Sequence, residues 1–417
     1  MRINIKKDLF MCYVLLVLFL PEGIRDITTI YQVFASDFVL IYPWLSYRLS
    51  ALEIPCIIAS LLFCRKSSKL IDIRPVFALI VIKELIRVFV GVTSVFSFND
   101  YSMLLGFLVG AGCYYLLVNN CGYNESDMLE IVIVLNFLFQ IVFAFTGRVM
   151  TDGRYATLGS GVGEIGSFCA QFFLYYLFVR KKEKHSIVLL ICCLGSLIIS
   201  ASRTNILLSL AFILMFANKL KGGFERNQKT KFIVSSFLIA TIFCMPVFLF
   251  ISTSQTSIFG DVLSRVSNTF QSLLTSNASN LTSDSSFLDR IQSINAGLGI
   301  LSHNPLGISA STIDLQLQTI ENGYYYFPHT SILCYYLLWG IAGLIVFVYI
   351  AKLFVEAIKQ NNSVWIIILY ILLTSVFYGG PIINCKTYFW YLCLFTVFKK
   401  ELGISNNYIH RKSVYYD

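Results

Sequence analysis

Residues 283–344 decide how the rest of the chain is interpreted. They begin with SDSSFLDRIQSINAGLGILSHNPLGI (283–308), continue through a polar gap, and end with FPHTSILCYYLLWGIAGL (327–344). In the first part, apolar residues recur at helical spacing, which predicts an amphipathic helix over about 286–302. Its apolar stripe consists of Phe287, Leu288, Ile291, Ile294, Leu298 and Leu301.

The ends of this helix carry their own signals. Ser286 is followed three residues later by Asp289, which fits a capping box at the start of the helix. Asn304-Pro305 predicts its end, because the residue before proline is disfavoured in helical conformation. Arg290 then falls in the first turns, beside the apolar stripe.

The composition is typical of a polytopic membrane protein. Of 417 residues, 57% are hydrophobic and only 13% are charged, which does not fit one soluble core. The net charge of +9 is explained by membrane topology, and no nucleic-acid-binding patch is visible. The 12 cysteines lack zinc-site spacing, and we interpret most of them as small apolar side chains in helices.

Apolar runs of roughly membrane length recur along the chain and predict an all-α protein with about twelve transmembrane helices. The first run, LFMCYVLLVLFL, follows basic residues but no small-residue cleavage site, so it is interpreted as an uncleaved span. The runs lie at about 9–20, 48–64, 72–95, 101–119, 128–147, 164–179, 186–202, 204–218, 231–252, 330–350, 364–379 and 383–398.

Lysine and arginine are concentrated in alternate loops, and this asymmetry predicts the orientation. Both termini are placed in the cytoplasm. The chain then divides into 1–252, with spans one to nine, an extracytoplasmic loop at 253–329 that contains the amphipathic helix, and 330–417, with spans ten to twelve and a cytoplasmic tail. We detect no internal repeat.

Basic residues are depleted on the predicted outer side, so those that remain there are candidate functional residues. Arg154 follows span five, Arg203 is expected to end span seven, and Arg290 opens the loop helix. A guanidinium group binds phosphate oxygens through two parallel hydrogen bonds, so three of them at one face could hold a diphosphate. The alternative is that each reaches lipid head groups or pairs with a nearby acid, such as Asp152 or Asp289.

His329 stands immediately before an apolar run that enters the membrane. An imidazole titrates near neutral pH and could accept a proton from a sugar hydroxyl. Its alternative role is to form hydrogen bonds at the membrane interface. His185 and His410 fall in predicted cytoplasmic segments, and His303 is assigned to capping or turn packing.

The apolar run at 72–95 contains three charged residues, Lys83, Glu84 and Arg87. Charges within a span must face protein or water. Glu84 and Arg87 are three residues apart and can pair on one helix face. An internal ion pair that fixes helix packing is the favoured interpretation, and the lining of a path for an anionic substrate, with Lys83 and Arg87 as binding residues, is the alternative.

Several catalytic motifs are missing from the sequence. The one pair of carboxylates two residues apart, Glu125 and Asp127, falls in a predicted cytoplasmic loop, so we expect a metal-independent mechanism. There is no P-loop, Rossmann fingerprint or Gly-x-Ser-x-Gly motif, and no cofactor is expected. A site on the outer face meets no ATP or nucleotide sugar, so its substrate must carry its own activated bond.

The order of these features resembles the Wzy-type O-antigen and capsule polymerases and the related O-antigen ligases. An arginine precedes a glycine-containing turn, a Ser-Arg pair ends a later span, and the large loop carries an arginine and an Asn-Pro-Leu-Gly turn. A histidine then opens a span with Gly-x-x-Gly inside it. The matching residues are Arg154 with Gly159, Gly161 and Gly163, then Ser202, Arg203, Arg290, Asn304 to Gly307, His329, Gly340 and Gly343.

The resemblance implies a GT-C-like glycosyltransferase that joins undecaprenyl-diphosphate-linked repeat units at the outer face of the bacterial cytoplasmic membrane. By analogy, Arg154, Arg203 and Arg290 bind the diphosphate, while Asn304 and Gly307 belong to the substrate-binding loop. His329 would orient or deprotonate the acceptor. The partners implied are the lipid-linked oligosaccharide, membrane lipids and, as a candidate, a Wzz-like chain-length regulator.

Two alternatives stay open at this point. An O-antigen ligase would transfer the glycan to lipid A core, and neither size nor motifs separate it from a polymerase. A flippase for lipid-linked oligosaccharides would also have about twelve spans, but it should carry charges through several spans and short loops on both sides.

Overall fold

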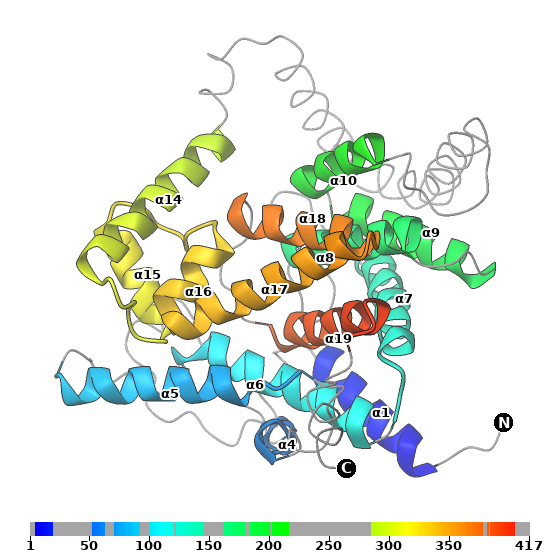
Figure 1. The fold of residues 1–417 in the computed structure, drawn as a ribbon, viewed down its shortest axis with the longest axis horizontal. Helices are drawn as coiled ribbons and strands as arrows, with labels where there is room; N and C mark the ends of the chain where they lie inside the picture. Colours follow the sequence, from blue (N-terminus) through cyan, green and yellow to red (C-terminus); the bar gives the residue numbers. More distant parts are fainter. Residues whose placement is uncertain are drawn as a thin grey trace, which may run out of the picture. The chain divides into compact units, whose positions relative to one another are not determined.

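The computed structural model describes residues 5–19, 52–62, 71–91, 100–120, 122–145, 162–179, 184–200, 202–216, 285–377, 382 and 384–404, and these residues form helices and turns without a strand (Figure 1). An all-α fold is therefore confirmed for the described part of the chain. The helices are α1 (Ile5–Phe19), α4 (Ile54–Leu62), α5 (Arg74–Phe89), α6 (Ser102–Tyr115) with the π-helical turn η5 (Leu116–Asn120), α7 (Glu125–Phe145), α8 (Val162–Phe178), α9 (Lys184–Ile199), α10 (Arg203–Met215), α14 (Ser285–His303), α15 (Thr312–Glu321), α16 (Ser331–Trp339), α17 (Ile341–Lys359), α18 (Val364–Phe377) and α19 (Cys385–Glu401).

The chain folds into two compact units that are discontinuous in sequence. Unit 1 comprises Met1–Leu129, Ser293–Gln360 and Gly380–Asp417, and unit 2 comprises Glu130–Gln292 and Asn361–Gly379. The helices α7 and α14 each begin in one unit and end in the other.

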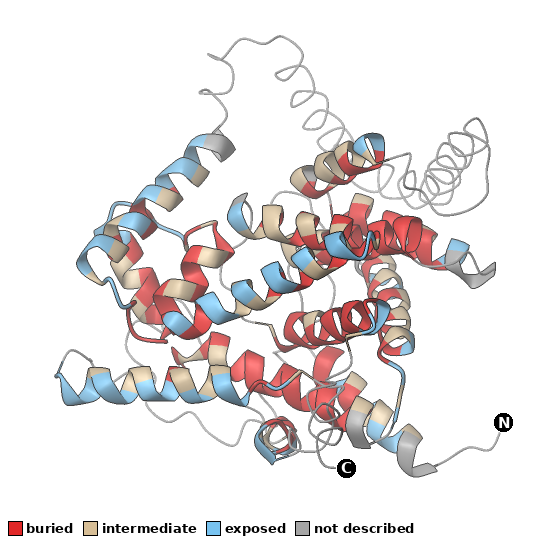
Figure 2. Cartoon of the chain, viewed as in Figure 1, coloured by how far each residue is buried: buried red, intermediate tan, exposed pale blue. Residues whose placement is uncertain are grey.

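Helix α5 in unit 1 has the reverse of the pattern found on water-facing helices. Its inward positions follow helical spacing. They are Ile80 and the three charged residues Lys83, Glu84 and Arg87. From residue 81 onward its exposed positions are all large and apolar, and Phe89 is 87% exposed. Figure 2 shows this exposed side in pale blue along the helix. Because exposed apolar side chains and inward charges suit hydrocarbon rather than water, α5 supports a position in a membrane.

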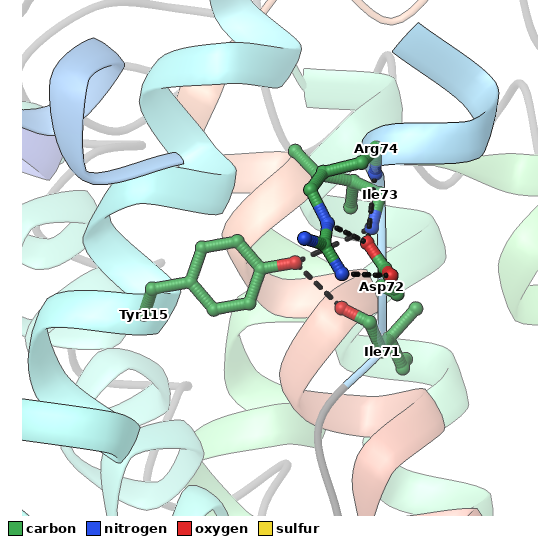
Figure 3. Close-up of polar contacts among 5 residues, drawn as sticks. All are labelled: Ile71, Asp72, Ile73, Arg74 and Tyr115. Atoms are coloured by element: carbon green, nitrogen blue, oxygen red, sulfur yellow. Dashed lines mark hydrogen bonds and ion pairs between the residues drawn. The ribbon is translucent and has the colours of Figure 1, made fainter. Parts of the chain in front are cut away.

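The segment that leads into α5 is tied to the end of α6 (Figure 3). The hydroxyl of Tyr115 donates to the carbonyl of Ile71 at 2.5 Å and accepts the backbone N–H of Ile73 at 3.4 Å. Arg74 pairs with Asp72 through two side-chain hydrogen bonds of 3.0 and 2.7 Å. This ion pair is well exposed, and such pairs add little stability, so Tyr115 is the contact that fixes the start of α5.

Helix α6 packs closely against α4 and α19 through glycine. A Cβ atom added at Gly112 would lie 1.8 Å from the carbonyl oxygen of Cys56 in α4. One added at Gly110 would lie 2.4 Å from the carbonyl oxygen of Cys385, the first residue of α19. Small residues of this kind let membrane helices approach at backbone distance.

We expect Gly112→Ala to destabilise unit 1 strongly, because the new methyl group meets backbone that cannot rotate away. Overpacking of this type costs about 1–3 kcal/mol. The measurement is the thermal midpoint of the detergent-solubilised protein, followed by size-exclusion fluorescence. Gly403→Asn is the control, because Gly403 has a φ of +60° and nothing within 4 Å, and asparagine tolerates that conformation. Equal midpoints for Gly112→Ala and the wild type would contradict the expectation.

The apolar run expected to form one span at 330–350 is divided at Gly340, so that expectation was wrong. Gly340 has a φ of +61° and a ψ of −135°, a conformation that ends α16 and starts α17 in a new direction. Helix α17, Ile341–Lys359, is the one described helix that is long and apolar enough to cross a membrane, with a mean hydropathy of 2.2.

Shorter apolar helices occupy five of the other predicted spans. They are Asp8–Phe19, Ser102–Val118, Ile187–Ile199, Thr204–Met215 and Val364–Val376. The predicted number of about twelve spans and the positions of the termini stay predictions.

The amphipathic helix expected over about 286–302 corresponds to α14, which ends at His303, just before Asn304-Pro305. Its packed face consists of small or inward side chains, Ser293, Ala296, Gly297 and Ile300. Three residues of the predicted apolar stripe, Leu288, Ile291 and Leu298, are exposed instead. The stripe is therefore a second face of α14, separate from the one that packs on the protein.

Helix α15 was not expected, because its sequence is part of the polar gap between the two apolar segments. Apolar residues alternate at Ile313, Leu315 and Leu317, which is a pattern of period two. The signal that could have identified the helix is its cap. The side chain of Ser311 accepts the backbone N–H of Asp314 at 3.3 Å, as a serine at the N-cap commonly does.

Candidate functional site

In unit 2, two of the candidate arginines, Arg203 and Arg290, lie at the N-terminus of α10. Helix α9 ends at Ile199 and α10 begins at Arg203. The expectation that Ser202 and Arg203 end a span was therefore wrong, because Ser202 is the non-helical N-cap of α10, with a φ of −79° and a ψ of 84°. Arg203 is the first residue of that helix.

The first turn of α10 is held in place by buried polar contacts. Asn205 donates to the hydroxyl of Ser202 at 2.7 Å and accepts the hydroxyl of Tyr370 at 2.7 Å. Ser202 also packs on Gly166 of α8, where an added Cβ would lie 2.5 Å from the serine Cβ. These contacts join α8, α10 and α18, so the position of this helix end is determined by the packing of unit 2.

Arg290 reaches the same turn of α10 from α14. Its Nη2 donates to the hydroxyl of Thr204 at 3.0 Å. Thr204 directly follows Arg203, so the fold brings Arg290 to the helix end that Arg203 opens. Arg154, the third expected arginine, lies outside the described residues.

This arrangement is chemically suited to an anion. The first backbone N–H groups of a helix have no partner within the helix, and the helix dipole places partial positive charge there. Phosphate groups bind such ends, and a neighbouring guanidinium adds two-point hydrogen bonds. The side chains of Thr204, Asn205 and Tyr370 were missed by sequence reasoning. A serine shortly before the apolar run at 206–216 was the signal that could have located the cap.

In unit 1, His329 lies two residues before α16 and is half-buried. Its backbone N–H donates to the hydroxyl of Ser293 in α14 at 3.1 Å. Its ring lies edge-on to Tyr324, with 6.2 Å between the ring centroids. The imidazole is thus placed by its backbone and by an aromatic neighbour, in the segment that leads into α16.

The turn at Asn304–Gly307 packs against the break between α16 and α17. Gly307 has a φ of +86°, and an added Cβ would lie 2.6 Å from the carbonyl oxygen of Leu337. The backbone N–H of Ile308 donates to the same carbonyl at 2.7 Å. The side-chain amide of Asn304 donates to Gln318 at 3.3 Å. Asn304 and Gly307, expected as substrate-binding residues, therefore make contacts that shape the turn itself.

The charged side chains of α5 bind the backbone around this turn. Arg87 Nη1 donates to the carbonyl of Gly307 at 3.0 Å, and Glu84 accepts the N–H of Ala310 at 3.0 Å. Lys83 donates to the carbonyl of Leu338 and lies 3.1 Å from Glu84. The expected ion pair thus has Lys83 as the partner of Glu84, while Arg87 binds backbone.

Two polar atoms of this cluster have no hydrogen-bond partner within the described part of the chain. They are Nε of Arg87 and Oε2 of Glu84, and both are buried. The other contacts of the cluster are explained by a structural role, in which its charges hold the turn and the helix packing. Because Nε of Arg87 still has a donor to offer, binding of an anionic ligand stays the alternative role for Arg87.

Asp314 of α15 lies at the edge of the same cluster, outside the predicted spans. Burial raises the pKa of this carboxyl above its ordinary value, although Gln318 and the nearby Arg87 act in the opposite direction. Asp314 also accepts the N–H of Ser309 at 3.2 Å. The turn is therefore held from α5, α15 and α16 together.

We expect Arg87→Met to lower the thermal midpoint of the protein, because the carbonyl of Gly307 loses a charged donor. An unsatisfied buried carbonyl costs about 1–3 kcal/mol. Arg74→Met is the matched control on the same helix, since its ion pair is exposed and worth little. If activity fell while the midpoint stayed unchanged, a substrate-binding role would replace the structural one.

One part of this chain matches a known protein family. Residues 188–348 match the model of the O-antigen ligase family. The matched segment is less than half of the chain, but it includes Arg203, Arg290 and His329 as well as the turn at Asn304–Gly307. No curated protein matches the chain. The family match supports the O-antigen ligase and polymerase superfamily and does not separate its two activities.

Proposed function

We propose that this protein is a polysaccharide polymerase, which joins undecaprenyl-diphosphate-linked oligosaccharide repeat units of an O-antigen or capsule. The match to the O-antigen ligase family supports an O-antigen-related glycosyltransferase function at this coarser level. The observation that carries the finer proposal is the hydrogen bond from Arg290 to the first turn of α10, which Arg203 opens.

The chemistry of the reaction explains why cations are needed at this turn. When a sugar is transferred from a lipid diphosphate, negative charge develops on the departing diphosphate. Preorganised cations and helix N–H groups stabilise that charge in the transition state. In the proposed mechanism Arg203 and Arg290, joined by Arg154, bind the diphosphate, and no metal ion is needed for its neutralisation.

The acceptor hydroxyl is assigned to His329. The imidazole would orient this hydroxyl or take its proton as the glycosidic bond forms. The backbone N–H of His329 is held by the hydroxyl of Ser293 in α14. The exposed apolar stripe of α14 would lie at the membrane surface beside the polyprenyl chains.

The proposed location is the outer face of the bacterial cytoplasmic membrane, with both termini in the cytoplasm. The inward charges and outward apolar side chains of α5 and the length of α17 support a membrane position. The proposed partners are the lipid-linked oligosaccharide, membrane lipids and a Wzz-like chain-length regulator.

The second candidate is an O-antigen ligase, which is favoured by the description of the matching family. A ligase would use the same lipid-linked donor and the same cations but would transfer the whole glycan to lipid A core. A flippase ranks third, because the described charges within predicted spans are concentrated in α5.

Deletion of the gene and analysis of chain length separates these candidates. Loss of a polymerase leaves a single repeat unit on the lipid, whereas loss of a ligase leaves full-length polymer on the carrier lipid. Loss of a flippase leaves the repeat unit on the inner side of the membrane. A ladder of normal length and normal lipid A attachment in the deletion strain would reject the first two functions.

A further inference from the structure

The segment between α15 and α16 carries a run of aromatic residues that the proposed mechanism does not use. It reads Asn322-Gly323-Tyr324-Tyr325-Tyr326-Phe327-Pro328-His329. Tyr324 is buried, but Tyr325 is 51% exposed and Tyr326 is 56% exposed. Two adjacent exposed aromatic rings on a short connecting segment suggest a binding role.

The backbone below these rings is fixed by contacts to three helices. The N–H of Tyr324 donates to Thr319 in α15 at 3.0 Å, and the side chain of Gln316 donates to the carbonyl of Tyr325. Beyond the tyrosines, α16 binds the carbonyl of Pro328 through Cys334 at 3.1 Å, and α14 binds the N–H of His329 through Ser293. The rings therefore stand on an ordered frame, which lowers the entropic cost of binding a ligand.

The rings form a continuous series that reaches His329. The ring centroids of Tyr324 and His329 are 6.2 Å apart, and those of Tyr324 and Tyr326 are also 6.2 Å apart. Tyr325 and Tyr326 follow at 5.3 Å, with their planes at 89°. Each contact is edge-to-face, a favourable arrangement for aromatic pairs. The two exposed rings are thus connected through Tyr324 to the imidazole.

We propose that Tyr325 and Tyr326 form a stacking platform for a pyranose ring of the lipid-linked glycan, positioned so that a hydroxyl of that sugar meets His329. A pyranose has a face of C–H groups that carry slight positive charge, and the face of an aromatic ring is negative. Tyrosine also offers rigid contact area and a hydroxyl that can bond to sugar hydroxyls. This inference rests on the proposed function, and it assigns the platform to the acceptor glycan.

Insertion into the membrane interface is the other use of exposed tyrosines. The neighbouring residues favour a sugar, because Glu321, Asn322 and Gly323 are exposed and polar or small. A lipid-facing surface would be apolar, as it is on α5. The rings also lead to a histidine rather than to the exposed stripe of α14.

The test uses the full-length protein in phospholipid nanodiscs. The probe is the oligosaccharide repeat unit released by mild acid from the carrier lipid of the producing strain, and binding is measured by calorimetry. Tyr326→Leu keeps apolar volume but removes the aromatic face, and we expect it to weaken binding about 3- to 10-fold. Tyr326→Phe restores the face and should recover most of the affinity. The same pair is made at Tyr325.

Turnover measurements distinguish glycan binding from a structural role of the two tyrosines, because a purely structural role would not raise KM alone. With lipid-linked acceptor, the leucine variants should raise KM while kcat changes little. Phe89→Leu is the control, because it removes an even more exposed aromatic ring on the outward side of α5. It should leave glycan binding unchanged.

The outcomes separate the platform from the proposed function. If deletion of the gene abolishes polymer but the leucine and phenylalanine variants bind glycan like the wild type, only the platform is rejected. If deletion leaves the polysaccharide unchanged while Tyr326→Leu still loses glycan binding, the proposed function falls and the platform stands. If leucine is fully tolerated in binding and KM and only charged or small polar substitutions lower membrane expression, the rings are interface anchors and the platform is rejected.

Discussion

Arg290→Lys is expected to reduce polymer formation about 10²-fold or more, although the positive charge is retained. Loss of one preorganised donor to a developing oxyanion costs about 10²- to 10³-fold in rate, and an ammonium cannot reproduce the two parallel hydrogen bonds of a guanidinium. Arg203→Lys should have an effect of similar size, because Arg203 opens the helix that Arg290 contacts. The measurement is the ladder of lipid-linked polymer in a complemented deletion strain.

Two controls accompany the arginine variants. Thr204→Val removes the hydroxyl that accepts from Arg290 and should cause a smaller loss, because it frees the guanidinium without deleting it. Arg74→Lys changes an exposed arginine that pairs with Asp72 and should leave the ladder unchanged. A near-normal ladder from Arg203→Lys and Arg290→Lys, at normal membrane expression, would remove both arginines from the proposed site.

His329→Ala is expected to lower the transfer rate by about 10²- to 10⁴-fold, the usual contribution of a general acid or base. Expression and the thermal midpoint should change little. The structural hydrogen bond of His329 is made by its backbone N–H to Ser293, and alanine keeps that donor. The rate is measured with purified protein and lipid-linked repeat unit.

The backbone and side-chain roles of this residue can be separated. Ser293→Ala removes the acceptor of the backbone N–H and should give a partial loss, through poorer positioning of the imidazole. His329→Gln keeps a polar side chain and shows whether hydrogen bonding to the acceptor is enough without proton transfer. A transfer rate of His329→Ala equal to that of the wild type would contradict the catalytic role and leave His329 as an interfacial residue.

Parts of the fold followed directly from the sequence. The 3.6-residue spacing of apolar side chains located α14, and Asn304-Pro305 marked its end at His303. Lys83, Glu84 and Arg87 were expected to face protein or water, and they lie on the inward side of α5. These features are local or follow from the cost of a charge in hydrocarbon.

Other parts could not be derived in this way. Gly340 interrupts a mainly apolar run. Its positive φ ends α16 at the place where the turn at Leu306 and Gly307 packs against it. The apolar residues at 313–317 alternate with a period of two, which is typical of a strand, so the pattern did not predict α15. The start of α10 at Arg203 depends on contacts of Ser202 and Asn205 with α8 and α18. In each case tertiary contacts outweighed local preference.

The sequence by itself predicted the all-helical class, which the described residues confirm, the membrane character and the candidate residues Arg203, Arg290 and His329, because hydropathy, helical period and charge are properties of short segments. Only the tertiary structure decided which of these residues meet. Arg290 bonds to Thr204 across 86 residues of sequence, and Lys83 bonds to Leu338 across 255. Such pairings are set by how helices pack and by the need of buried polar groups for partners, and neither is encoded in a local pattern.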